Sequence, residues 1–198
     1  MKLIFATHNP NKVSEIQAML PSGIELVSLK DLDDHDEIEE TASTIEGNAK
    51  LKVEAIANRY NYPCFADDTG LEVNALNAEP GVKSARYAVE TKDSKANMRK
   101  LLNNLADKSN RKAQFKTVIA YKAKGGQILT FGGICKGEIL KSARGEGGFG
   151  YDPIFLPSGY TQSFAEMTAN EKHLISHRGL AFKKFIKFLS ESHKNKTL

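Results

Sequence analysis

The 198-residue sequence contains no tryptophan and only two cysteines, Cys64 and Cys135. The cysteines form no close pair, so neither a disulfide framework nor a redox or zinc motif is indicated. No apolar stretch approaches the length of a membrane span, and the run at residues 3–6 is too short for a signal peptide. We therefore expect a cytoplasmic protein that makes no use of a membrane.

Several common nucleotide and metal motifs are also missing. The chain has no phosphate loop ending in Gly-Lys-Ser or Gly-Lys-Thr, and no histidine cluster with zinc spacing. The glycine loop at residues 145–150 formally matches the dinucleotide-binding fingerprint, but that fingerprint must open a helix, and this loop runs into Pro153. We also find no convincing activated serine or cysteine nucleophile. These absences argue against a phosphate-loop NTPase, a Rossmann dehydrogenase and a zinc enzyme.

Composition and charge are those of an ordinary globular protein. Hydrophobic residues make up 40% of the chain, charged residues 26%, and the net charge is only +4. The basic residues are dispersed, apart from Lys183, Lys184, Lys187 and the tail, so a nucleic-acid partner is not expected. The length suits one well-buried domain over residues 1–198, with residues 193–198 expected to fray.

Hydrophobic periodicity predicts alternating strands and helices. Strands are expected at residues 3–6, 24–29 and 64–66 and as a hairpin at 113–121 and 127–135, and helices at about 12–20, 44–60, 94–105 and from 177 onward. This order predicts an α/β or mixed α+β fold. We expect a two-lobed single domain with a twisted mixed sheet, a central substrate cleft and ligand sites at strand ends.

Two pairs of carboxylates are candidates for metal binding. Asp67 and Asp68 follow an apolar strand directly, before an expected turn at residues 69–70, and Glu39 and Glu40 end an acidic loop. Carboxylates from two loops, completed by substrate phosphates, are what Mg2+ requires. The structural alternative is that the glutamates only cap a helix dipole and the aspartates only form a turn.

Basic and aromatic groups suggest how an anionic, flat ligand could be held. Lys12 opens a helix whose first amides could bind phosphate, and Lys172 and Arg178 flank a second helix start. The glycines around Phe149 allow close backbone approach to a flat base. His177 and Arg178 offer hydrogen-bond donors for a carbonyl oxygen. The structural alternatives are that the basic residues are solvated surface charges, that the glycine loop is a hairpin turn, and that His177 only caps a helix.

Taken in order, the motifs resemble the inosine/xanthosine triphosphate pyrophosphatase family, also called the Ham1-like family, over nearly the whole chain. The resemblance rests on Ala6-Thr7-His8-Asn9-Pro10-Asn11-Lys12, Glu39-Glu40-Thr41, Ala66-Asp67-Asp68-Thr69-Gly70-Leu71, Pro80-Gly81, Ser84-Ala85-Arg86-Tyr87, Gly147-Gly148-Phe149-Gly150-Tyr151-Asp152-Pro153 and Ser176-His177-Arg178-Gly179. It implies a homodimer that hydrolyses ITP, dITP and XTP to the monophosphate and pyrophosphate with Mg2+.

The resemblance also implies roles for individual residues. Asp68 is expected to be the general base and a metal ligand, with Glu39 or Glu40 as the other ligand. The residues expected to bind substrate are Thr7, His8, Asn9, Pro10, Asn11, Lys12, Thr69, Phe149, Gly150, Tyr151, Asp152, Lys172, His177 and Arg178. The chain departs from the family pattern at His8, Ala42 and Val89, where glycine is usual, and at Thr69, where serine is usual.

The resulting hypothesis is attack of water on the α-phosphorus, with His177 and Arg178 reading the six-position of the purine. A house-cleaning pyrophosphatase for other modified nucleotides and a non-catalytic nucleotide-binding protein are the alternatives. Turnover measured with a panel of substrates would distinguish a pyrophosphatase for other modified nucleotides. The absence of turnover would favour a non-catalytic nucleotide-binding protein.

Overall fold

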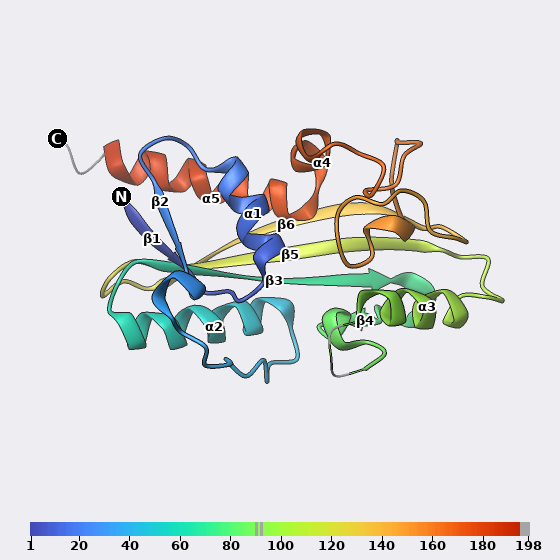
Figure 1. Ribbon diagram of the computed structural model, residues 1–198, viewed down its shortest axis with the longest axis horizontal. Coiled ribbons are helices and arrows are strands. Elements are labelled where there is room, and N and C mark those ends of the chain that lie inside the picture. Colours follow the sequence, from blue (N-terminus) through green and yellow to red (C-terminus); the bar gives the residue numbers. More distant parts are fainter. Residues whose placement is uncertain (90, 92, 195–198) are drawn as a thin grey trace. The chain divides into compact units, whose positions relative to one another are not determined.

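The computed structural model describes residues 1–89, 91 and 93–194 (Figure 1). The strands are β1 (Lys2–Phe5), β2 (Glu25–Ser28), β3 (Cys64–Val73), β4 (Pro80–Gly81), β5 (Lys112–Lys122), β6 (Ile128–Ile139) and β7 (Phe155–Pro157). The α-helices are α1 (Pro10–Met19), α2 (Ile45–Tyr60), α3 (Ser94–Asn104), α4 (Ala169–Ile175) and α5 (His177–Lys194). Four short 3-10 helices complete the described elements: η1 (Lys30–Leu32), η2 (Asn74–Leu76), η3 (Ser84–Arg86) and η4 (Asp152–Ile154).

All seven strands belong to one mixed sheet in the order β2-β1-β3-β5-β6-β7, with β4 paired to β3. The pairs β1–β2 and β1–β3 are parallel, whereas β3–β4 and β6–β7 are antiparallel. Because β2 and β3 lie on opposite sides of β1, the strand order reverses at β1. In open α/β sheets ligands bind at the carboxyl ends of strands at such a switch point. The predicted mixed α/β class is confirmed, and the topology points to the segments that follow β1 and β3.

The chain divides into two compact units, which are described separately. Unit 1 comprises Met1–Asp68, Thr117–Gly133 and Arg178–Leu198, and unit 2 comprises Thr69–Lys116 and Ile134–His177. The division agrees with the two-lobed organisation expected from the sequence. The central cleft, and the assignment of residues 1–198 to a single domain, stay predictions.

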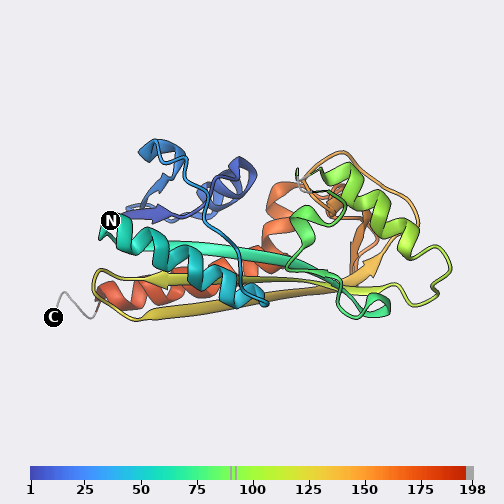
Figure 2. The same ribbon diagram turned by 90° about the horizontal axis from the view of Figure 1, so that it is seen from below.

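The core of unit 1 is built from aromatic residues of strands and of α5. Phe5 and Phe65 stack on neighbouring parallel strands with ring centroids 4.4 Å apart, and Phe185 of α5 lies 5.2 Å from Phe65. Helices α1 and α5 lie on one face of these strands and α2 on the other (Figures 1 and 2). The two crossover helices that follow β1 and β2 therefore cover opposite faces, as expected where strand order reverses.

Unit 2 has a core of its own around Phe115. This ring lies 4.7 Å from Phe155 and 6.1 Å from Phe164, and Leu101 of α3 joins the same cluster. Helix α3 begins where the Asp93 side chain accepts hydrogen bonds from the amides of Lys95 and Ala96, the arrangement of a helix N-cap. Unit 2 thus has an apolar centre that does not depend on the aromatic stack of unit 1.

One prediction about the strands was wrong. We expected the strand after Pro63 to end at Asp67 and Asp68, but β3 continues to Val73 and residues 69–70 form no turn. The physical reason is that Leu71 and Val73 are fully buried, so the apolar pattern resumes beyond the aspartates. Helix α4 and strand β7 were not predicted, because each is short and lies in a polar or proline-containing segment.

Among the helices of residues 1–89, 91 and 93–194, none combines the length and apolar character that crossing a bilayer requires. Helix α5 extends to Lys194, and the fraying expected for residues 193–198 falls largely on positions outside the described part of the chain.

Candidate active site

The loop between β1 and α1 is ordered by its own side chains. Asn9 caps α1, and its Oδ1 accepts from the amides of Asn11 at 3.0 Å and Lys12 at 3.4 Å. Thr7 Oγ1 in turn accepts from the Asn9 amide, and Pro10 occupies the first helical turn. The amides of Asn11 and Lys12, which were expected to bind phosphate, therefore already have an acceptor. The positive charge near this loop is carried by the Lys12 ammonium.

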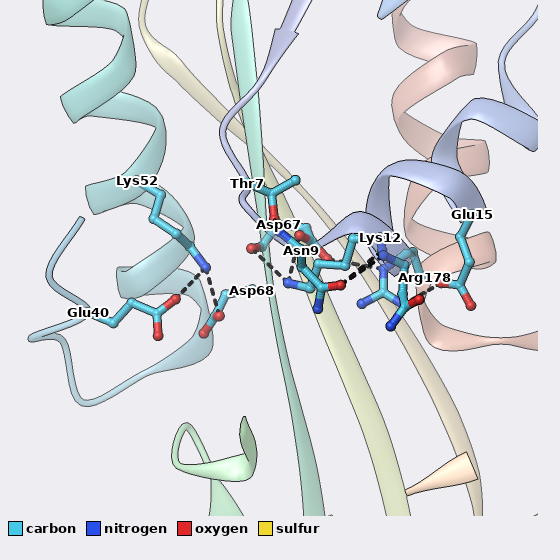
Figure 3. A network of polar contacts seen from close by, with 10 residues as sticks. Thr7, Asn9, Lys12, Glu15, Glu40, Lys52, Asp67, Asp68 and Arg178 are labelled. Atoms are coloured by element: carbon cyan, nitrogen blue, oxygen red, sulfur yellow. Dashed lines mark hydrogen bonds and ion pairs between the residues drawn. The ribbon is translucent and has the colours of Figure 1, made fainter. Parts of the chain in front are cut away.

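Asp67 lies at the centre of a buried charged network in unit 1 (Figure 3). Its Oδ1 is 2.8 Å from Lys12 Nζ, and its Oδ2 is 3.1 Å from Arg178 Nε. Arg178 Nη1 also donates to Glu15 Oε2 at 2.6 Å, and the Arg178 side chain is almost completely buried. Burial opposes ionisation of Asp67, but the charges of Lys12 and Arg178 outweigh it and hold the pKa of this carboxyl far below its usual value.

Asp68 faces the opposite way along β3, as alternation along a strand requires, and meets a different cation (Figure 3). Lys52 Nζ from α2 lies 2.9 Å from Asp68 Oδ1 and 2.8 Å from Glu40 Oε1. Burial would lower the pKa of Lys52, but Asp68 and Glu40 more than compensate and raise it, so this ammonium is charged. Glu40 and Asp68 thus meet at the Lys52 ammonium, and the metal ion expected between these carboxylates stays a prediction.

The second oxygen of Asp68 has no partner. Asp68 Oδ2 is buried and accepts no hydrogen bond from any residue that the structure describes. Burial raises the pKa of the Asp68 carboxyl, although Lys52 and Lys12 act in the opposite direction. A buried carboxylate oxygen without a donor is costly unless something else satisfies it. A buried carboxyl with a perturbed pKa is a candidate for a functional site.

These oxygen donors fit a hard divalent cation whose remaining ligands come from water and substrate. Asp68 Oδ2 and the Glu40 carboxylate are oxygen donors of the type that Mg2+ prefers, and one or two carboxylates with phosphates are its usual environment. Within the ranges described, no three His, Cys, Asp or Glu side chains gather into a complete protein-only metal site. Glu39 is exposed and is not among the residues that contact Lys52.

Unit 2 gathers a second set of the predicted residues, around Asp152. Asp152 Oδ2 accepts from the Phe149 amide at 2.8 Å and from Lys172 Nζ at 2.7 Å. Gly148 has φ +69°, and a Cβ there would lie 2.1 Å from Asp152 Oδ2, so this turn requires glycine. Lys172 comes from α4, whose start is held by a capping box between Thr168 and Glu171.

Aromatic rings surround this second set. The His177 ring stacks on Phe115 with centroids 4.4 Å apart, and Lys172 Nζ lies 5.1 Å from the centroid of the Phe149 ring. The Tyr151 hydroxyl donates to the Ser84 carbonyl at 2.9 Å, and burial raises the pKa of that hydroxyl. Phe115, Tyr151 and His177 are buried, whereas Phe149 is partly exposed and offers a ring against which a flat heterocycle can stack.

The predicted residues thus separate into two groups. Thr7, Asn9, Lys12, Glu40, Asp68 and Arg178 lie in unit 1, whereas Thr69, Phe149, Gly150, Tyr151, Asp152, Lys172 and His177 lie in unit 2. His8 belongs to unit 1 and its ring nitrogen Nε2 lies 3.1 Å from the Asp36 carbonyl oxygen. The guanidinium of Arg178 binds Asp67 and Glu15, and its expected role in reading a carbonyl together with His177 stays a prediction.

Sequence reasoning missed Lys52 and Glu15. Lys52 lies on the buried stripe of α2 between Ala49 and Ile56, both fully buried, and this was the available signal. A lysine on an apolar helix face is rarely buried without a partner. Glu15 on α1 gave no such signal, because it is one of several polar residues of that helix and its partner Arg178 is far away along the chain.

Comparison with known proteins identifies the family. The model of the Ham1 family matches residues 3–188. A protein of Christiangramia forsetii named dITP/XTP pyrophosphatase is 56% identical over 191 residues, covering 96% of this chain and 100% of that protein. A protein of Bacillus subtilis with the same name is 45% identical over 189 residues, covering 94% of this chain and 96% of its own.

Solved structures give the same result for the fold. The Staphylococcus aureus Ham1 protein superposes with a TM-score of 0.88 at 40% identity, covering 97% of this chain and 100% of that chain. A HAM1 protein from Coxiella burnetii has a TM-score of 0.88 at 37% identity, covering 96% and 99%. Since the match extends over both units and nearly the full length of each relative, this chain belongs to the Ham1 family.

Proposed function

We propose that this protein is a pyrophosphatase that hydrolyses the non-standard purine nucleoside triphosphates dITP, XTP and ITP to the monophosphate and pyrophosphate. Family membership and the names of its relatives support the activity. The single structural observation that carries it is the buried Asp68 carboxylate, with one oxygen held by Lys52 and the other without a partner.

Asp68 is proposed to act as the general base. Its raised pKa makes the carboxylate a better proton acceptor than an ordinary aspartate, while Lys52 orients Oδ1 and leaves Oδ2 for the reaction. The water that loses its proton to Asp68 attacks the α-phosphorus. The bond from that phosphorus to the bridging oxygen then breaks, and pyrophosphate leaves.

Asp68 and Glu40 are proposed to hold Mg2+, with Glu40 rather than Glu39 as the second ligand because only Glu40 joins the cluster through Lys52. Such an ion, when bound, neutralises charge on the phosphate oxygens as the phosphoanhydride bond breaks.

The triphosphate is proposed to be bound by the loop from Thr7 to Lys12. Lys12 is positioned by Asp67, and burial lowers the pKa of its ammonium while the Asp67 charge opposes that change. A largely desolvated ammonium attracts phosphate oxygens more strongly than an exposed one. Arg178 and Glu15 are proposed to position Asp67 rather than to bind the base.

The base is proposed to be bound by the residues of unit 2. Phe149 provides partly exposed aromatic surface, Tyr151 supports it from the core, and Lys172 orders the Phe149 backbone through Asp152. His177 is proposed to donate to the keto oxygen at the six-position of the purine. An amino group at that position cannot accept, and leaving a buried donor unpaired costs about 1–3 kcal/mol. Guanine carries the same keto group, so this contact by itself separates ATP but not GTP.

The direct test is pyrophosphate release by the purified protein with dITP, XTP, ITP, GTP and ATP, with Mg2+ and with a chelator. We expect turnover of the first three substrates that requires the metal. A preference for modified pyrimidines would instead identify a different house-cleaning pyrophosphatase, and nucleotide binding without turnover would identify a non-catalytic binder. A homodimer, a cytoplasmic location and the absence of a nucleic-acid partner remain predictions.

A further inference from the structure

Glu40 lies on a segment that has neither helix nor strand. Residues 33–44 connect η1 to α2, and the side chain of Glu40 must reach Lys52 from the middle of that segment. Ordering an irregular segment costs conformational entropy for every residue that is held in place. A ligand on such a segment binds a metal well only if the segment is already held in place before the metal arrives.

The first anchor of this segment is Asp34. Its side chain is only 3% exposed and accepts from both Arg59 Nη1, at 2.6 and 2.5 Å, and the Tyr60 hydroxyl, at 2.7 Å. Burial opposes ionisation, but the hydrogen bonds from Tyr60 and Arg59 outweigh it and lower the pKa of Asp34. Arg59 and Tyr60 form the last turn of α2, so this charged clamp attaches the start of the segment to the end of the helix.

Further contacts continue the clamp through Asp36. The Asp36 amide donates to Asp34 Oδ1 at 3.1 Å, and Arg59 Nη2 lies 3.5 Å from Asp36 Oδ2. The ring of His8, in the proposed phosphate-binding loop, lies 3.1 Å from the Asp36 carbonyl oxygen. The clamp therefore holds a stretch that also contacts the phosphate-binding loop.

A second anchor lies on the other side of Glu40. The Ala42 amide donates to Oδ1 of Asn48, a residue only 2% exposed on the first turns of α2. A Cβ on Gly47 would lie 2.6 Å from the Ala42 Cβ, so the segment packs closely on the helix there. Glu40 is thus held between two attachments to α2, and the same helix carries Lys52 between them.

We propose that Asp34 is a positioning residue for the Glu40 metal ligand, acting through Arg59 and Tyr60. The proposal rests on the metal role of Glu40 given under Proposed function. Helix α2 acts as a rigid template that sets the distance from the Glu40 backbone to the cluster around Asp68. Loss of the Asp34 clamp leaves the chemistry of Asp68 intact but lets the segment move, so that metal binding has to order it.

The test compares Asp34→Asn with Asp33→Asn, which makes the same chemical change at the neighbouring position. Asp33 is an exposed aspartate with φ 54°, a conformation that asparagine tolerates, and its side chain pairs with the exposed ring of His35. For Asp34→Asn we expect about tenfold weaker Mg2+ affinity, the lower end of the range for losing a group bonded directly to a metal ligand, because Asp34 holds the segment rather than Glu40 itself. Turnover at saturating Mg2+ should stay within about threefold of the unaltered protein, and Asp33→Asn should change neither quantity.

Two readouts do not depend on turnover. Mg2+ binding is measured by calorimetry without substrate, and amide hydrogen exchange is measured across residues 35–44. Asp34→Asn should weaken Mg2+ binding and accelerate hydrogen exchange across residues 35–44. A merely structural role would instead lower the melting temperature and leave Mg2+ affinity unchanged. Unchanged Mg2+ affinity in folded Asp34→Asn overturns the proposal.

Two additional variants keep the outcome decisive. Glu40→Gln tests the proposed function itself: if it binds Mg2+ normally, the assignment of Glu40 as a ligand fails, whatever Asp34→Asn does. If Asp34→Asn does not fold, Tyr60→Phe removes a single hydrogen bond of the clamp and should weaken Mg2+ binding by a few fold. Unaltered affinity in folded Tyr60→Phe then overturns the role of the clamp.

Discussion

The polar residues of the two units are buried by different means. In unit 1 the buried charged groups are held by opposite charges, as in the contacts from Lys12 through Asp67 to Arg178. In unit 2 His177 is held against the Phe115 ring, and the buried ion pair of Lys172 and Asp152 lies against Phe149. Opposed charges suit a polyanionic ligand that competes for them, whereas aromatic surfaces suit a flat base.

Within unit 1, a contrast between the neighbouring carboxylates of Asp67 and Asp68 separates function from stability. Asp67 has a depressed pKa and two cationic partners, whereas Asp68 has a raised pKa and an oxygen without a partner. The first carboxylate is satisfied in the folded protein and contributes to stability. The Asp68 carboxylate is not fully satisfied and does not stabilise the fold in this way, which is consistent with a catalytic role.

Replacement of Asp68 by asparagine should give the largest effect on the reaction. We expect turnover of ITP to fall by about 10²- to 10⁴-fold, the range attributed to a general base. A raised folded-state pKa means that the ionised carboxylate disfavours folding at neutral pH, so the variant should melt close to the unaltered protein. Rates and melting curves measured together check this, and near-normal turnover would remove Asp68 from its role.

Replacement of Asp67 by asparagine should give the largest effect on stability. It leaves the buried charges of Lys12 and Arg178 without their shared partner, which costs about 3–5 kcal/mol of unfolding free energy. Urea denaturation in the presence of a chelator measures this difference. A loss no greater than that of Asp68→Asn would contradict the distinction between the two neighbouring carboxylates.

The same pair predicts a pH dependence. Because the folded-state pKa of Asp67 lies below its unfolded value of about 3.9, its stabilising effect is present above that value and is lost as the pH falls below it. The difference in unfolding free energy between the unaltered protein and Asp67→Asn should therefore be constant from pH 7 to about 5 and shrink below about pH 4. Chelator-treated samples unfolded at several pH values would show this, and a gap that widens toward acid would refute it.

Replacement of His177 by alanine tests the contribution of unit 2. We expect the preference for ITP over ATP to fall by about 5- to 150-fold, equivalent to about 1–3 kcal/mol. Phe115→Leu is the matched control, because it removes the stacked ring and keeps the histidine. Equal losses of ITP and ATP turnover in His177→Ala would exclude a base-reading role.

The smallest effect is expected at the surface of α2. Lys50 pairs with Glu46 one turn away and is about half exposed, whereas Lys52 is buried between Glu40 and Asp68. Lys50→Met should change unfolding free energy by no more than about 0.5 kcal/mol and leave turnover unchanged. Lys52→Met should reduce turnover strongly, and similar behaviour of the two variants would contradict the assignment of Lys52 to the cluster.

Long periodic elements were predicted well because local interactions decide them. Helix α2 was expected from residue 44 to 60, and the structure places its N-cap at Thr44 and its end at Tyr60, followed by Asn61 in the left-handed conformation. The hairpin was expected because β5 alternates and a Gly125-Gly126 turn follows. Short elements such as α4 and β7 carry too few residues for a period to be recognised.

The sequence alone determined the family, the fold class and the identity of most candidate residues, because ordered motifs and hydrophobic periodicity are properties of the chain. Only the tertiary structure decided which charges meet. It selected Glu40 over Glu39, brought Lys52 between Glu40 and Asp68, and turned Arg178 toward Asp67. Residues more than a hundred positions apart become neighbours only when strand pairing and helix packing bring them together. A local sequence pattern does not indicate which of these distant residues will meet.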